Sequence, residues 1–509
     1  MTTSSRILVA IALFLAIVPS SIAKVVALQI SPASSYGVFK RGEFMLMEGR
    51  FTGELAPGDA IPGLDRAPRN SRGMVEYRAG FVLIAPREPA AGNGTLLLDV
   101  PNRGRPISHF MYNSARGKIL PLTLDPGSGF LQNEGFSVVS VQWELGQGID
   151  LPAFIDSAGS KHFVEGAGPA ALRDFAEFLR YAKQDEGNPL PGRVERVVAI
   201  GYSQTARLLK TMLIEGFDQS AGRRIFDGMH VHASASGQAD VFATGSGPAS
   251  STFFTPRFTH PEHRGVTEEP LTYRDILARV AERRLRPPLL IVTNVTIDYY
   301  SIRASLARTG VQGVTDVPIP STVRIYDIAG GSHSLTTEKR CEFPPGQLDF
   351  TPALRAALLN LDQWLRNGRE PPPTRLMPLE PRPREEGLLQ APKHLPGAIV
   401  QAPKLDADGN SLGGVRLPDI EVPLGTHGTQ NRPLADRACN LDGSFIAFAR
   451  NRIEQGAGDG RPPLSERYRD AAAYIERVRA AAERLVAERL LLEHDAAEII
   501  RAAQMVSMP

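Results

Sequence analysis

The sequence predicts an α/β protein in which a mostly parallel sheet is covered by helices on both faces. Short runs at residues 95–100, 136–143 and 288–295 are apolar almost throughout and do not alternate with polar residues. Strands of this kind are buried on both faces, as in parallel sheets. A helical pattern separates such runs at 169–182. A strand, a sharp turn and a helix follow one another at 194–213, which is typical of a doubly wound sheet.

The composition is that of an ordinary globular protein. The chain has 509 residues, of which 42% are hydrophobic and 22% charged, and its net charge is +2. This length supports one large core with additions, and the near-zero charge gives no reason to expect nucleic acid as a partner. The sequence contains no His-Glu-x-x-His motif, no cysteine cluster and no glycine-rich phosphate-binding signature. We therefore expect no metal or other cofactor.

The first 23 residues are predicted to be a signal peptide. Arg6 is their only charge, residues 7–18 are apolar throughout, and Ser21 and Ala23 form a small-x-small cleavage site. The apolar run is short for a membrane span, and an uncleaved anchor is the alternative. The sequence thus predicts a mature chain that begins at Lys24, has no stable membrane span, and works in the periplasm or outside the cell.

Nine segments are expected to be strands. They are residues 25–30, 44–51, 74–86, 95–100, 136–143, 197–200, 229–233, 288–295 and 322–328. A loop rich in Ser, Pro and Gly separates the first two, and 229–233 has the least distinct pattern. Helices are expected at 169–182, directly after Ser203, and at 352–364.

These elements divide the chain into four parts. They are the signal peptide (1–23), an N-terminal β extension (24–75), a catalytic core (76–370) and a C-terminal extension (371–509). Residues around 236–265 have no clear period and are expected to form an excursion over the sheet, with a lid as one role. In the C-terminal part we expect a helix at 465–488 capped by Ser465 and a last helix capped by Asp495. This part is too rich in loops for a core of its own, so it should pack on the catalytic core.

The turn in 194–213 places a serine between strand and helix. Gly201-Tyr202-Ser203-Gln204-Thr205 matches most of the G-x-S-x-G motif, which holds a nucleophilic serine on a strained turn. Thr205 stands where the motif has its second glycine, so the match is partial. A buried turn whose serine only caps the helix is the simpler alternative. As a nucleophile, Ser203 requires a base, because a serine hydroxyl is weakly nucleophilic by itself.

His333 is the predicted base. In the fold that uses this motif, the catalytic residues follow in the order serine, acid, histidine. The strand at 322–328 leads into Ala-Gly-Gly-Ser-His-Ser, a glycine-rich loop that can fold back toward the serine. Other histidines after the serine fit less well: His230 and His232 lie on an expected strand, His260 and His263 in the excursion, and His427 in a flexible C-terminal loop.

Asp298 is the predicted acid. It follows the strand at 288–295 and precedes His333 by 35 residues, which leaves room for one helix and one strand. Its carboxylate would orient the imidazole and stabilise its cationic form. The alternative is an N-cap for a helix at 299–306. Three other acids are worse placed, because Asp227 and Asp240 come early and Asp327 lies inside a strand.

An oxyanion hole needs two backbone N–H groups aimed at the developing charge. One is expected from Gln204, and the other from Arg103 or Gly104, which follow the strand at 95–100. Arg103 as a structural ion-pair partner is the alternative. The two cysteines, Cys341 and Cys439, are expected to form a disulfide in an oxidising compartment, with two buried thiols as the alternative.

The chain resembles a bacterial family of long secreted proteins, the alpha/beta hydrolase domain family. The stretches that carry the resemblance are Asn102-Arg103-Gly104, GYSQTARLLKTMLIEGF, IDYYSIRASLARTG, AGGSH, LDFTPALRAALLNLDQWLRNGREPPPTR, GGVRLPDIEVPLGT and LSERYRDAAAYIERV. The resemblance spans nearly the whole mature chain, and it implies the α/β-hydrolase fold with Ser203, Asp298 and His333 as the triad. Members often have Glu at the position of Asp298, and residues 142–146 differ from the family's tryptophan–glycine-rich version. The family does not fix a substrate.

The sequence therefore predicts a secreted serine hydrolase that acts on carboxylic esters through an acyl-enzyme intermediate. The expected partner is a small-molecule ester, and we make no prediction of the oligomeric state. Two alternatives remain at this point: an amidase or peptidase with the same triad, and a non-catalytic binding protein of the cell envelope that keeps the fold.

Overall fold

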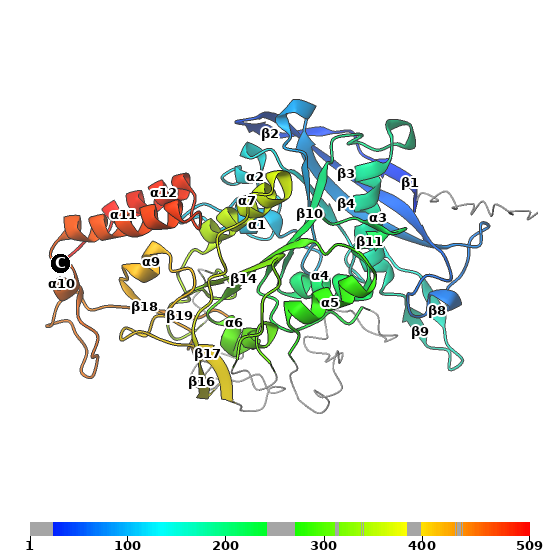
Figure 1. Cartoon of the computed structure of the whole chain (residues 1–509). Coiled ribbons are helices and arrows are strands. Elements are labelled where there is room, and N and C mark those ends of the chain that lie inside the picture. Colours follow the sequence, from blue (N-terminus) through cyan, green and yellow to red (C-terminus); the bar gives the residue numbers. More distant parts are fainter. Residues whose placement is uncertain are drawn as a thin grey trace, which may run out of the picture.

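A large mixed sheet forms the centre of the molecule. The computed structural model describes residues 24–241, 270–310, 315–336, 338, 341–383, 399–432, 434, 439 and 441–509. The strands of the large sheet are β1 (Val25–Ile30), β2 (Ser34–Phe39), β3 (Gly42–Leu55), β4 (Val75–Pro86), β5 (Thr95–Asp99), β6 (Ser137–Val141), β7 (Ile149–Asp150), β10 (Arg196–Tyr202), β13 (Gly228–His232), β14 (Leu289–Val295) and β15 (Val323–Ile328). They run in the order β1-β3-β4-β6-β5-β10-β13-β14-β15, with β2 and β7 paired off this path. Figure 1 labels β1, β3, β4, β10 and β14 of this sheet.

The nine predicted strands are the nine along this path, so the predicted fold class is confirmed. Strands β6, β5, β10, β13, β14 and β15 are parallel, and β1, β3 and β4 join them in antiparallel register. The N-terminal strands thus continue the same sheet through the β4–β6 ladder. One prediction is wrong: residues 34–39 form β2 and not a loop, because β3 offers them a hairpin partner from Phe39↔Gly42 to Ser34↔Leu46.

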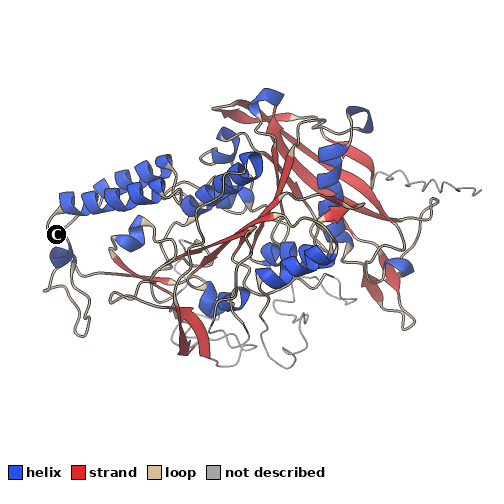
Figure 2. Cartoon of the chain, in the orientation of Figure 1, coloured by secondary structure: helices blue, strands red, loops and turns tan. Residues whose placement is uncertain are grey.

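Helices cover both faces of the sheet (Figure 2). On one face lie α3 (Ala167–Tyr181), α4 (Gln204–Glu215) and α5 (Tyr273–Glu282), and on the other α1 (Ser108–Tyr112), α2 (Phe130–Asn133) and α7 (Thr351–Asn367). Successive strand residues serve opposite faces: Leu96 and Leu98 join the α3–α4–α5 cluster, whereas Leu97 joins the α1–α7 cluster. Every position in β5 is therefore apolar or buried, which explains why the sequence does not alternate.

The C-terminal part adds small sheets and a helical pair. Its elements are β16 (Leu379–Pro383), β17 (Ile399–Pro403), α9 (Pro418–Glu421), β18 (Gly425–Gly428), β19 (Ser444–Ala447), α10 (Leu464–Arg467), α11 (Ala471–Ala487) and α12 (Glu493–Gln504). Further short elements include β8 (Ala153–Ile155), β9 (Lys161–Phe163), β11 (Gln219–Ser220), β12 (Arg223–Arg224) and α6 (Asp298–Ser301). Buried residues of α11 and α12, such as Val478 and Ile499, share one hydrophobic cluster with Leu358 of α7. The C-terminal part thus packs on one face of the core.

Two predicted helix caps are wrong. The expected helix at 465–488 is split into α10 and α11, and the side chain of Asp470, not Ser465, accepts the N–H of Ala473 at 2.7 Å. Asp495 lies inside the first turn of α12, but its carboxylate is fully buried and paired with Arg355 of α7 at 2.6 Å. A buried carboxylate is costly unless it is paired, and Arg355 supplies the counter-charge for Asp495.

Two expectations concern residues outside the described ranges. The signal peptide at 1–23 is one of them, and most of the excursion around 236–265 is the other. Within the described part of the chain, no helix is both long enough and apolar enough to cross a bilayer.

Candidate active site

Ser203 lies on a sharp turn at the C-terminal end of β10. Its backbone has φ 56° and ψ −110°, a conformation that non-glycine residues rarely adopt. The turn is attached to the neighbouring strand β13, because the N–H of Ser203 donates to the carbonyl of His232 at 2.9 Å. A side chain at Gly201 would bring a Cβ within 2.7 Å of the backbone nitrogen of Ala206. Strand and helix therefore pass so closely that glycine is required before the serine.

Thr205 explains why the turn forms without the motif's second glycine. Its side chain is buried, and its Oγ1 accepts the N–H of Tyr202 at 3.0 Å and donates to the carbonyl of Tyr202 at 3.2 Å. The threonine thus closes the turn around Ser203 through hydrogen bonds that glycine could not make. Sequence alone showed Thr205 only as a departure from the motif.

The structure brings Ser203, His333 and Asp298 together in one line of hydrogen bonds. His333 Nε2 is 2.9 Å from Ser203 Oγ, and His333 Nδ1 is 2.6 Å from Asp298 Oδ1. Asp298 is fully buried, and its other oxygen accepts the N–H of Val295 at 3.2 Å. Although Asp298 begins α6, it does not cap that helix, because its side chain points to the histidine. This arrangement can remove the serine proton and stabilise the resulting imidazolium.

Tyr202 joins the serine turn to the histidine loop, a contact that the sequence analysis missed. Its hydroxyl donates to the backbone carbonyl of His333. Its ring stacks on the imidazoles of both His333 and His232, with centroids 5.4 Å apart in each case. The imidazole of His333 is therefore held by its ring face, by its own backbone and by Asp298.

The other histidines considered as a base lie elsewhere in the described structure or outside it. His230 and His232 are fully buried on β13, and Thr293 Oγ1 contacts Nε2 of the first and Nδ1 of the second. Burial lowers the pKa of His230 to about 3 and that of His232 to about 4, so both are neutral near pH 7. His427 lies in strand β18 and not in a flexible loop. His260 and His263 lie outside the described residues.

The residues predicted to form the oxyanion hole flank Ser203. Arg103 and Gly104 occupy the centre of a tight turn, both with positive φ (50° and 75°), and reciprocal backbone hydrogen bonds of Asn102 and Arg105 close that turn at 2.8 and 3.1 Å. The amide of Asn102 donates to the carbonyl of Tyr202 at 3.0 Å. This bond fixes the turn against the serine.

Gln204 begins α4 directly after the serine, so its backbone N–H belongs to the first turn of a helix. Its side chain donates to Glu144 Oε1 at 2.8 Å, and both residues are buried. Glu144 comes from the loop after β6 and was not predicted. Its contact is 60 positions away from Gln204 in sequence, and no local pattern indicates it.

Arg207, one turn further along α4, is a buried cation near the site. Burial lowers its pKa to about 10, while the Asp298 carboxylate acts in the opposite direction and Arg103 in the same direction. Arg207 remains charged at neutral pH and places a positive charge in the helix that begins directly after Ser203. Among the described residues, no group of three or more His, Cys, Asp or Glu side chains is arranged to hold a metal ion.

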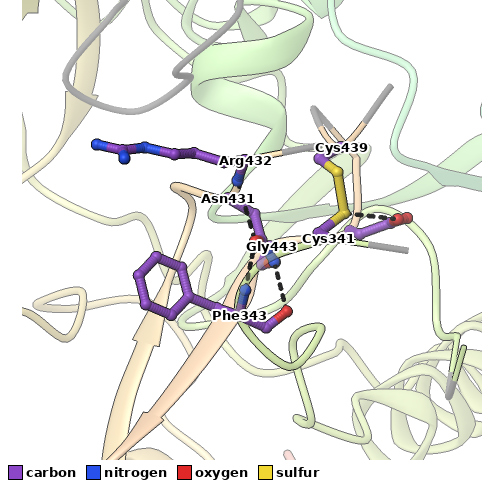
Figure 3. Close-up of a disulfide and its surroundings, with 7 residues drawn as sticks. Cys341, Phe343, Asn431, Arg432, Cys439 and Gly443 are labelled. Atoms are coloured by element: carbon purple, nitrogen blue, oxygen red, sulfur yellow. Dashed lines mark hydrogen bonds between the residues drawn. A yellow bond between two sulfur atoms is a disulfide. The ribbon is translucent and has the colours of Figure 1, made fainter. Parts of the chain in front are cut away.

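A disulfide braces the loop that carries His333. Cys341 and Cys439 are bonded, and Figure 3 shows Asn431 beside them, bridging Phe343 and Gly443. The Asn431 amide donates to the carbonyl of Gly443 at 2.7 Å and to that of Phe343 at 3.1 Å.

The segment next to Cys439 in turn contacts the histidine loop. The N–H of Ser334 donates to the carbonyl of Leu441 at 3.1 Å, and the N–H of Gly346 donates to the carbonyl of Asp442 at 2.8 Å. The C-terminal part therefore supports a loop of the site, through both covalent and hydrogen bonds.

Comparison with known proteins gives one family match and several structural likenesses. A family model described as "Alpha/beta hydrolase domain" matches residues 158–501. No curated protein matches significantly. The rice cell wall degrading esterase LipA from Xanthomonas oryzae is 12% identical and has a TM-score of 0.29, with 59% of this chain and 90% of that chain covered. A glucuronoyl esterase from Solibacter usitatus is 15% identical at a TM-score of 0.29, with 60% and 82% covered.

Proposed function

This chain belongs to the alpha/beta hydrolase domain family, whose model covers residues 158–501, and on that premise we propose that it is a secreted serine hydrolase of carboxylic esters. One observation carries the proposal. His333 links the other two residues: its Nε2 is 2.9 Å from Ser203 Oγ, and its Nδ1 is 2.6 Å from Asp298 Oδ1. The serine lies on a strained turn. A structural serine has no need of that conformation, which costs free energy.

The proposed reaction follows from these contacts. Ser203 Oγ attacks the ester carbonyl carbon while its proton passes to His333 Nε2, and a tetrahedral oxyanion forms. The C–O bond to the alcohol then breaks, and His333 returns the proton to the departing oxygen. Water, deprotonated by His333, attacks the acyl-enzyme, and Ser203 leaves with the proton. Asp298 stays ionised and holds the imidazole in the tautomer that accepts at Nε2.

The oxyanion is proposed to be bound by backbone N–H groups of Gln204 and of the turn at Arg103 and Gly104. Support comes from the hydrogen bond between Asn102 and the Tyr202 carbonyl, which fixes that turn beside Ser203. The start of α4 adds the positive end of a helix dipole, and the buried cation Arg207 lies in the same helix. Preorganised donors of this kind supply several kcal/mol of transition-state stabilisation.

Secretion is part of the proposal. Residues 1–23 have the charge and apolar pattern of a signal peptide, and the Cys341–Cys439 disulfide is of a kind that persists in oxidising compartments. N-terminal sequencing of the protein exported by a host cell tests this step, with Lys24 expected as the first residue. An export product that retains Met1 would contradict it.

The activity is tested with a fluorophosphonate probe and with p-nitrophenyl acetate. We expect the mature protein to be labelled and to release p-nitrophenol, and Ser203→Ala to do neither above background. Ser220→Ala, a buried serine of β11, is the matched control and should be labelled like the wild type. A folded wild-type protein that resists the probe, or a Ser203→Ala variant that keeps full activity, would overturn the proposal.

A further inference from the structure

A cavity of about 390 Å³ lies beside the histidine loop. Its wall includes Ile119, Leu335, Thr336, Pro344, Pro345 and Asp349. Its volume falls in the range of pockets that bind small organic ligands. None of these residues takes part in the relay of Ser203, His333 and Asp298, so the mechanism described above leaves the cavity unused.

The cavity adjoins the histidine loop through Leu335 and Thr336, which follow His333 in that loop. Because consecutive Cα atoms are 3.8 Å apart, the Cα atoms of Leu335 and His333 lie within about 7.6 Å of each other. The opposite wall, at Pro344–Gly346, is attached to the same C-terminal segment that holds the histidine loop, through the bond from Gly346 to Asp442. Both walls are therefore fixed relative to His333.

The lining is mostly apolar and contains one acid. Asp349 is buried, its Oδ1 accepts both the N–H and the hydroxyl of Thr351, and burial raises the pKa of its carboxyl. The arginines that act on this carboxyl, Arg116 and Arg355, are engaged in ion pairs with Asp419 and Asp495. A negative charge placed here would be poorly compensated, so the cavity disfavours an anion, and its mostly apolar lining favours an uncharged group.

The leaving group of the proposed reaction must lie next to His333. In the acylation step His333 Nε2 gives its proton to the departing alcohol oxygen, which requires hydrogen-bond distance between them. The alcohol part of the ester is thus the part of the substrate that reaches the histidine side of the site. The cavity lies on the loop that carries that histidine.

We infer that this cavity is a leaving-group subsite that binds an uncharged, apolar alcohol moiety of the ester. The inference rests on the proposed function and adds the substrate class to it. Each methylene of the alcohol that the cavity buries should raise kcat/KM about fourfold, because burial of one CH₂ is worth about 0.8 kcal/mol. The effect belongs to acylation, since all acetate esters share one acetyl-enzyme intermediate.

The test uses acetate esters of ethanol, butanol and hexanol with the mature protein, and acetate release as the readout. For the wild type we expect kcat/KM to rise by at least tenfold from ethyl to hexyl acetate. Leu335→Trp and Ile119→Trp should remove that rise, so that both variants lower kcat/KM for hexyl acetate far more than for ethyl acetate. Ile155→Trp, on the exposed β8 strand, is the matched control and should keep the rise.

Charge provides a second readout. The acetate ester of 6-hydroxyhexanoic acid should be at least tenfold poorer than hexyl acetate, and Asp349→Asn should narrow that gap. The inference is overturned if labelled wild-type enzyme shows no dependence on alcohol length, or if the tryptophan variants lower ethyl and hexyl acetate equally. An enzyme that is not labelled and hydrolyses no ester overturns the proposed function itself, and the subsite falls with it.

Discussion

In the proposed reaction Asp298 acts only through His333, so its replacement separates orientation of the imidazole from the presence of the other two groups. In the wild type, His333 Nδ1 is 2.6 Å from a carboxylate oxygen of the fully buried Asp298. Asp298→Asn keeps the size of this side chain but places an amide beside Nδ1. We expect kcat on p-nitrophenyl acetate to fall by about 10⁴-fold with KM nearly unchanged, because the wrong tautomer is favoured.

Asp298→Glu should be compared with Asp298→Asn, because it keeps the negative charge on a side chain that is one methylene longer. We expect it to recover a large part of the activity lost in Asp298→Asn. Equal activity of Asp298→Asn and the wild type in steady-state kinetics would show that this acid does not orient His333.

His427, which takes no part in the proposed reaction, makes the free energy of unfolding depend on pH. Burial lowers its pKa to about 4, against 6.5 in an unfolded chain, although Asp419 acts in the opposite direction. As the pH falls from 6.5 to 4 the unfolded state binds a proton that the folded state does not, so stability is lost across this window. The loss is about 3 kcal/mol for this one group, at 1.36 kcal/mol per pKa unit.

His427→Phe should remove that contribution and keep the ring contact with Phe445, whose centroid is 4.9 Å away. We expect urea unfolding of the variant to depend less steeply on pH between 6.5 and 4 than that of the wild type, by about 3 kcal/mol in total. Parallel pH curves for the two proteins would mean that His427 titrates normally.

Residues of the site were predictable where chemistry leaves a local mark. Ser203 follows a strand and a glycine, and His333 follows a late strand and two glycines, so local pattern and sequence order together select them. Tyr202 and Glu144 leave no such mark. Their partners, His333 and Gln204, lie 131 and 60 positions away, and only the folded sheet brings them together.

At the scale of elements, the N-terminus of α11 offers a direct comparison between two caps. Asp470 accepts the N–H of Ala473 at 2.7 Å, whereas Ser465 belongs to the short helix α10. Asp470→Ala should lower the free energy of unfolding by about 1 kcal/mol, the usual value of an N-cap. Ser465→Ala is the control and should change it by less than about 0.5 kcal/mol. A larger loss in Ser465→Ala, measured by urea unfolding, would support the cap expected from sequence.

Strands buried on both faces were well predicted, since both layers demand apolar residues at every position. The segment at 34–39 was not, because Ser34, Ser35 and Gly37 carry no strand pattern and the segment is a strand only by pairing with β3. The helix boundary at 467–471 was missed for a related reason. Arg467, Tyr468 and Arg469 have no helix-breaking character, and the local capping bond of Asp470 decides where α11 begins.

At the scale of the whole molecule, the C-terminal part is joined to the core by a buried ion pair. Arg355 of α7 donates to both carboxylate oxygens of Asp495 in α12 and also to the carbonyl of Ser114, at 2.7 Å. Both side chains are almost fully buried. Asp495→Asn leaves a buried cation without its counter-charge, and we expect it to lower the free energy of unfolding by about 3–5 kcal/mol.

Two further variants make this prediction specific. The double variant Arg355→Met with Asp495→Leu should be more stable than Asp495→Asn alone, because no uncompensated charge is buried. Glu466→Gln breaks an exposed pair with Arg452 and should have no measurable effect. If thermal unfolding showed Asp495→Asn to be as stable as the wild type, the attachment of α12 would not depend on this pair.

The disulfide has a consequence for the order in which the protein matures. Ser203, Asp298 and His333 all precede Cys341, whereas the partner cysteine lies 98 residues further along the chain. A ribosome releases the three residues of the proposed triad long before it releases Leu441 and Asp442, whose carbonyls hold the histidine loop. The growing chain thus contains Ser203, Asp298 and His333 before it contains Cys439. The support of the histidine loop is therefore complete only after the C-terminal part has been synthesised and Cys341 and Cys439 have been oxidised to the disulfide.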